Sequence, residues 1–80
     1  MTNYNWYANY ETWNVALIIS NTELYHSAVD FTKDFKGNNP YIAFVKFMGL
    51  ESKETLDGVS YIHHELDFQE LNEFMLDLND

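Results

Sequence analysis

The sequence predicts an all-α fold, a compact bundle of about four helices in a single domain that spans residues 1–80. Apolar residues recur at helical spacing in four segments, and residues that favour helix caps bracket most of them. A chain of 80 residues has room for one core. Aromatic residues make up 18% of the chain and supply large buried areas, so that a domain without Cys can fold without disulfides. A short β element near residues 55–62 is the one exception expected.

The segment from Asn9 to Ser20 predicts the helix around which the others pack. From Trp13 to Ile19 only Asn14 is polar, and a helix that is apolar on most of its circumference must be covered on more than one side. Asn9 is the expected N-cap. We therefore predict a central helix with Trp13 buried in the middle of the bundle. A buried strand is the alternative, because the run contains three β-branched residues.

A second helix is predicted from Thr22 to Lys36. Gly37 follows at the position where a left-handed residue is expected to end the helix. The apolar face of this helix recurs at spacings of four, three and four residues, through Leu24, Ala28, Phe31 and Phe35.

A third, short helix is predicted from Tyr41 to Met48. Asn39 is its expected N-cap, Pro40 fits the first helical position, and Gly49 ends it. A strand is the alternative here as well, because the segment is rich in Phe and Val.

The last helix begins after Asp67, its expected N-cap, and Glu70 is the expected partner of Asp67 in a capping box. Its core-facing side chains are predicted to be Phe68, Leu71, Phe74, Met75 and Leu78. Between the third and last helices, Asp57-Gly58 predicts a tight turn within the short β element.

Residues 1–8 form an aromatic N-terminal arm with Tyr4, Trp6 and Tyr7. A disordered segment would be poor in aromatic residues, so we expect the arm to fold back onto the core. An exposed arm used for binding is the alternative.

Charge is the most unusual property of the chain, which carries thirteen acidic residues against four Lys and no Arg, net −9. Residues 1–50 have four acids and three lysines, whereas residues 51–80 have nine acids and one lysine. Direct binding of nucleic acid or of anionic membrane surfaces is therefore not expected, because both require clustered positive charge. The longest apolar run has five residues, far below the roughly 20 that cross a bilayer. We expect a cytoplasmic protein, with a basic protein surface as its partner.

The last helix carries the predicted partner-binding site. Acidic residues recur along one face at steps of three or four, without Lys or Arg to pair with them. Like charges at this spacing destabilise a helix by a few tenths of a kcal/mol per pair, so stability alone would favour interspersed lysines. A solvated face that keeps the protein soluble is the alternative. The predicted partner-binding residues are Glu65, Asp67, Glu70, Glu73, Asp77 and Asp80.

No pattern in the sequence predicts catalysis, a cofactor or a metal. The serines lie in no nucleophile-elbow motif, and the isolated glycines at 37, 49 and 58 form no phosphate-binding loop. His63 and His64 are adjacent, and we expect their side chains to diverge rather than share one ion. The chain is predicted not to be an enzyme.

The run Asn9-Tyr10-Glu11-Thr12-Trp13-Asn14-Val15-Ala16-Leu17 resembles the hallmark N-Y-E-T-W-x-V-x-L-W of a family of small uncharacterised proteins encoded by bacteriophages and plasmids. Asp57-Gly58-Val59 and the acidic last helix fit the later part of the family pattern, whereas Ile18 replaces its second Trp. The resemblance implies a mobile element as the source and the cytoplasm of an infected cell as the location. Small acidic phage proteins are often inhibitors of host enzymes or defence complexes.

The resulting functional hypothesis is a non-catalytic phage protein that binds a host protein through its acidic C-terminal surface. It would inhibit a nucleic-acid-binding or anti-phage defence factor, with DNA mimicry as one mode. The alternative is a structural or assembly module that binds a phage partner or itself as a homo-oligomer. A single-strand binder that uses Tyr4, Trp6 and Tyr7 is the third hypothesis, and the net charge argues against it.

Overall fold

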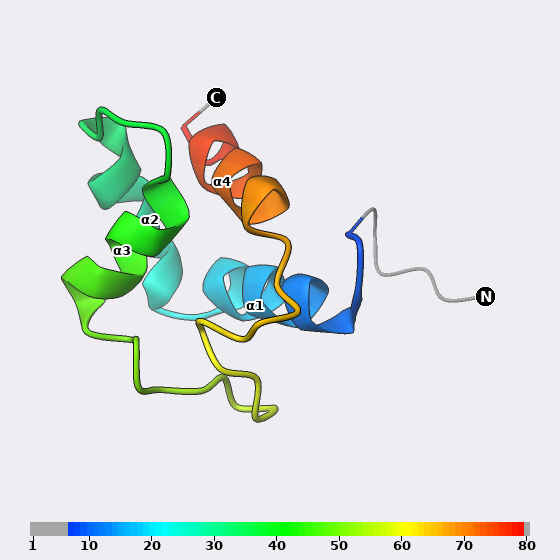
Figure 1. Cartoon of the computed structure of the whole chain (residues 1–80). Coiled ribbons are helices and arrows are strands. Elements are labelled where there is room, and N and C mark those ends of the chain that lie inside the picture. The colour runs from blue at the N-terminus through cyan, green and yellow to red at the C-terminus, as the bar shows by residue number, and fades with distance from the viewer. Residues whose placement is uncertain (1–6, 80) are drawn as a thin grey trace.

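Four α-helices make up the fold in the computed structural model, which describes residues 7–79 (Figure 1). The all-α prediction is therefore confirmed. The helices are α1 (Tyr10–Asn21), α2 (Leu24–Lys33), α3 (Pro40–Met48) and α4 (Phe68–Asp77).

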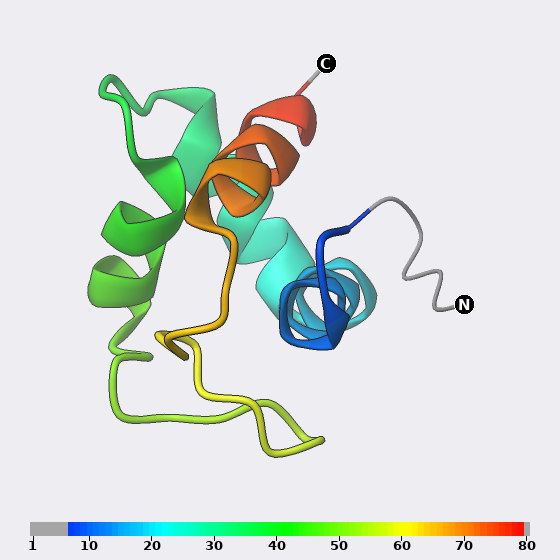
Figure 2. The same cartoon turned by 45° about the vertical axis from the view of Figure 1, so that its right-hand side comes forward.

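The two helices in the middle of the bundle are α2 and α4, which contact each other and both of the remaining helices. Within the described residues, α1 and α3 lie on opposite sides of this pair and do not contact each other. Turning the molecule shows α1 end-on, beside α4 and apart from α3 (Figure 2). The prediction that the first helix is central is therefore wrong, although its helical conformation is confirmed.

The core is apolar and draws on all four helices and on the segment that links α3 to α4. Trp13 is only partly buried and lies outside the fully buried core, so its predicted place at the centre of the bundle is wrong. Two polar residues of α1, Thr12 and Asn14, are completely buried instead. The core cluster consists of Val15, Ala16, Ile19, Ala28, Tyr41, Phe44, Val45, Leu50, Val59, Tyr61, Leu66, Leu71 and Met75.

Most of the predicted caps are observed. The Asn9 side chain accepts a hydrogen bond from the Thr12 backbone N–H at 2.9 Å and caps α1. Pro40 opens α3, and Gly49 ends it with a left-handed backbone at φ 70°. The Asn39 side chain makes no capping bond and instead accepts from Asn72 Nδ2 at 3.2 Å.

Helix α2 ends three residues earlier than predicted, at Lys33, so Gly37 is not its C-cap. The Asn79 side chain donates to Thr32 Oγ1 at 2.6 Å and thereby fixes the last turn of α2 against the end of the chain. Beyond this turn, the Phe35 ring stacks on Phe31 with 5.5 Å between centroids. A Cβ at Gly37 would lie 2.9 Å from the Phe35 ring, so a larger residue there would require this ring to shift.

The segment between α3 and α4 crosses beneath the helices as an extended tube (Figures 1 and 2). An isolated antiparallel bridge joins Glu54 to Ser60. Gly58 turns the chain between them with φ 88°. The short β element predicted near residues 55–62 is thus present in this minimal form.

Candidate functional site

One buried polar side chain of α1, Asn14, holds the segment between α3 and α4 in place. Asn14 Nδ2 donates to Asp57 Oδ2 at 2.6 Å, and Asn14 Oδ1 accepts from the Thr55 hydroxyl at 2.6 Å. The Thr55 oxygen in turn accepts from the Val59 backbone N–H at 3.2 Å. No buried side-chain nitrogen or oxygen of the described residues lacks a hydrogen-bond partner. Because a buried amide must be paired, this network fixes which face of α1 points inward.

The N-terminal end of α1 is tied to the start of α4 by a second set of bonds. Asn9 Nδ2 donates to the Glu65 carbonyl at 2.6 Å. The Asp67 backbone N–H donates to Thr12 Oγ1 at 2.9 Å. Three polar residues of the N-terminal motif, Asn9, Thr12 and Asn14, therefore serve to attach residues 55–67 to α1.

Two of the predicted partner-binding residues take part in internal structure. The Asp67 side chain accepts from the Glu70 N–H at 3.0 Å, which confirms it as the N-cap of α4. Glu70 Oε1 accepts from the Ala8 N–H at 2.8 Å. The reciprocal bond of the predicted capping box is absent, because the Asp67 N–H is taken by Thr12 and the Glu70 carboxylate by the N-terminal arm.

The remaining predicted site residues of the described chain are exposed. Glu73 and Asp77 lie on the exposed side of α4. The ion pairs between described residues join Lys33 to Asp30 and His64 to Glu65, so none of the four lysines pairs with Glu73 or Asp77. Asp80 lies outside the described residues.

The two adjacent histidines do not diverge as predicted. Their rings stack with centroids 4.6 Å apart, and His63 Nδ1 accepts from the Glu65 N–H at 3.0 Å. Among residues 7–79, no group of three or more His, Cys, Asp or Glu side chains is arranged to hold a metal ion.

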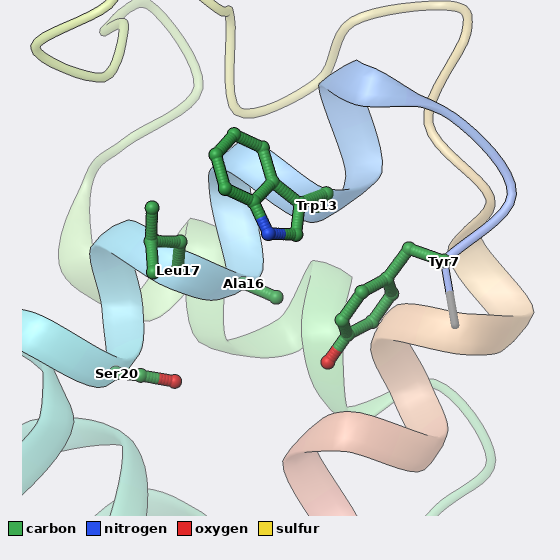
Figure 3. A pocket seen from close by; sticks show the side chains of 5 residues that line it. All are labelled: Tyr7, Trp13, Ala16, Leu17 and Ser20. Atoms are coloured by element: carbon green, nitrogen blue, oxygen red, sulfur yellow. The ribbon is translucent and has the colours of Figure 1, made fainter. Parts of the chain in front are cut away.

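A small pocket lies between Tyr7 of the N-terminal arm and α1, and no sequence pattern predicted it. It has a volume of about 130 Å³. In Figure 3 the Tyr7 ring lies beside α4 and faces the Trp13 and Ala16 side chains of α1. The Ser20 hydroxyl lies on the side of α1 that faces Tyr7. The lining residues are Tyr7, Trp13, Ala16, Leu17 and Ser20.

The Tyr7 side of this pocket is close to the acidic face of α4. Burial and, after it, the nearby carboxylates of Glu70 and Asp77 raise the pKa of the Tyr7 phenol above its usual value of 10. Within the arm, Tyr7 packs partly buried against the core, as predicted for this residue. Tyr4 and Trp6, the other aromatic residues of the arm, lie outside the described residues.

Large apolar side chains are also exposed on other elements of the described chain. Phe47 on α3 is 69% exposed, yet its ring lies 5.2 Å from that of Phe31 on α2. Leu56, in the turn that Gly58 completes, is 90% exposed. A Phe side chain exposed to this degree leaves apolar area available for an interaction.

These features define a small all-α domain in which, within residues 7–79, an acidic helix face lies beside a small apolar pocket. A family model, described as a family of unknown function, DUF7249, matches residues 1–80. The chain belongs to this family. Comparison with curated proteins gave no match, and neither did comparison with solved structures. Within residues 7–79, no helix has the length and apolar character needed to span a membrane.

Proposed function

We propose that this protein is a non-catalytic binding module that docks onto a basic surface of another protein through the exposed face of α4. The observation that supports the proposal is the isolation of Glu73 and Asp77. Both side chains are exposed and neither pairs with a lysine, whereas Asp67 and Glu70, at the N-terminal end of α4, have internal partners. Two carboxylates at a spacing of four residues repel each other along a helix. Their retention fits a surface that is neutralised on binding.

The resemblance to phage and plasmid proteins extends this proposal to the kind of partner. The partner would be a host protein that itself binds nucleic acid, for example an anti-phage defence factor, and the acidic face would occupy its phosphate-binding surface in the infected cell. Clustered positive charge is what such a surface offers. The protein would then act as an inhibitor by competing with DNA or RNA.

The test is a charge reversal with a matched control. The variant Glu73→Lys/Asp77→Lys changes the net charge by the same amount as Glu51→Lys/Glu54→Lys, whose side chains are also exposed but lie outside α4. Each folded protein is used to capture partners from bacterial lysate at low and high salt. We expect the parent and the control pair to capture the same protein, and the α4 pair to lose it.

Competition decides the mode of binding. An excess of duplex DNA should displace the captured partner if the acidic face occupies a phosphate-binding surface. Capture that the α4 reversal leaves unchanged, in a protein whose thermal melt is intact, would reject the acidic face as the docking site.

The exposed ring of Phe47 supports a second candidate function, a structural or assembly module that associates with itself. Phe47 is the main argument, because a Phe that is 69% exposed leaves a large apolar area in contact with water. Sedimentation equilibrium of the parent and of Phe47→Ser tests it. A parent that is monomeric throughout the accessible concentration range would reject this candidate.

A further inference from the structure

The pocket between the N-terminal arm and α1 has the size of a single side chain. Typical small-molecule sites occupy about 300–1,000 Å³, whereas this pocket has about 130 Å³. An apolar protein cavity of about 150 Å³ accommodates one benzene ring. The space therefore fits one aromatic or branched aliphatic side chain rather than a cofactor or a metabolite.

The lining defines the chemistry of that side chain. Aromatic and aliphatic groups form most of the wall, from Tyr7, Trp13 and Leu17, and Ser20 contributes a hydroxyl (Figure 3). Among residues 7–79, no charged side chain lines the pocket. An inserted charge would lose its hydration without gaining a partner, so the inserted group must be uncharged.

The surroundings of the pocket are acidic on the side of α4. Ala8, next to Tyr7, is held there, because its backbone N–H donates to Glu70 Oε1 at 2.8 Å. The Tyr7 phenol lies in the field of Glu70 and Asp77. A group that enters beside Tyr7 therefore has carboxylates next to it on one side, and cationic neighbours would be complementary to them.

We infer that the pocket receives one apolar side chain of the protein partner, Phe or Leu in type, and that Lys or Arg residues flank this side chain in the partner and face α4. This inference rests on the proposed function and specifies how the partner is recognised. The acidic face brings the basic segment close, and the pocket holds its anchor residue. Burial of a single anchor side chain in a pocket is how many interfaces obtain most of their binding energy.

Three synthetic peptides test the inference on the full chain. The first has one Phe between two pairs of Lys, the second has Ser in place of the Phe, and the third has Glu in place of every Lys. Affinity is measured by NMR titration, with the Trp13 indole N–H as the reporter. We expect the first peptide to bind at least about tenfold more tightly than either of the others, because burying a Phe ring and pairing its flanking charges both contribute.

Two pairs of protein variants distinguish the contribution of the pocket to peptide affinity from that of the acidic face. Ser20 is exposed, so Ser20→Leu should fill the pocket without disturbing the core. This variant should bind the first peptide about tenfold more weakly than the parent. Asn21→Leu adds the same side chain to an exposed neighbour outside the pocket and should change nothing. Glu73→Lys/Asp77→Lys should weaken binding of the same peptide, and most strongly at low salt. The control pair Glu51→Lys/Glu54→Lys should leave its affinity unchanged.

The outcomes distinguish the inference from the proposed function. If Ser20→Leu has no effect while the α4 reversal abolishes binding, the acidic docking face stands and the pocket inference is overturned. If the peptide with Glu in place of Lys binds as well as the first, or the α4 reversal has no effect, both fail. Self-association of the parent that Ser20→Leu abolishes would make a second copy the occupant. Affinity that rises several-fold in Trp6→Ser would make the chain's own Trp6 the occupant, and either result overturns the inference.

Discussion

Helices α1 and α4 lie against each other and have similar lengths, but different interactions orient them. The buried residues of α4 are apolar, Leu71 and Met75, and its polar residues lie mainly outside. The buried residues of α1 include Thr12 and Asn14. Thr12 bonds to the backbone N–H of Asp67, and Asn14 bonds to the side chains of Thr55 and Asp57, so each partner is more than 40 residues away in the chain. The apolar Trp13 and Leu17 are displaced to a partly exposed face. The difference shows that hydrophobic periodicity orients a helix only where no buried hydrogen-bond network competes with it.

The largest effect is expected from the apolar core of α4. Leu71 is fully buried, so Leu71→Ala should lower the free energy of unfolding by about 3 kcal/mol through lost burial and the cavity left behind. Leu76 on the same helix is 51% exposed, and Leu76→Ala is the matched control, with an expected change below about 0.5 kcal/mol. Urea denaturation measures both. Equal effects of the two changes would show that α4 is not oriented as described.

The second largest effect on stability is expected from the polar network of α1. Asn14→Ala should cost about 2.5 kcal/mol, because the Thr55 hydroxyl and the Asp57 carboxylate both lose a partner. Asn21→Ala, at an exposed position of the same helix, should cost far less. A double-mutant cycle with Thr55→Val should give a non-additive result, since both residues belong to one network. Additive costs would mean that the network does not orient α1.

Trp13 tests the other face of α1. Because the ring is only partly buried and lines a pocket, Trp13→Ala should cost about 1.5 kcal/mol, since solvent can fill the space that it leaves. A fully buried Trp would cost about 3–5 kcal/mol. Thermal and urea melts decide between the two values, and a cost in the higher range would restore Trp13 to the core.

The smallest effect at neutral pH is expected at Tyr41, which packs against α4 through Phe68 with 6.1 Å between ring centroids. Its hydroxyl donates to the Tyr61 carbonyl at 2.8 Å, so Tyr41→Phe should cost about 1 kcal/mol at pH 7. Urea melts of the parent and the variant at pH 7 measure this cost.

Alkaline pH should reveal a second effect of the same residue. Burial, and secondarily Tyr61, raise the pKa of Tyr41 far above its usual value of 10. The stability that this proton confers is complete below pH 10, the usual value, and is lost as the pH rises from there toward the raised pKa, because the unfolded chain ionises first. Melts between pH 8 and pH 11 should therefore show a shallower loss in Tyr41→Phe than in the parent. Parallel curves would contradict the assignment.

The sequence alone determined the helical class, the start and end of α1 and α3, and the core face of α4. These features depend on local physical chemistry: a capping side chain at Asn9 or Asp67, a Pro at the first helical position, a left-handed Gly49, and apolar residues at a spacing of three and four. Tertiary structure alone decided that α2 and α4 form the centre, that Asn14 is buried and Trp13 is not, and that Tyr7 and Trp13 enclose a pocket. The physical reason is that a buried polar group needs a partner. Asn14 stood out as the single polar residue in an apolar run, but its partners Thr55 and Asp57 are local neighbours only in the folded chain.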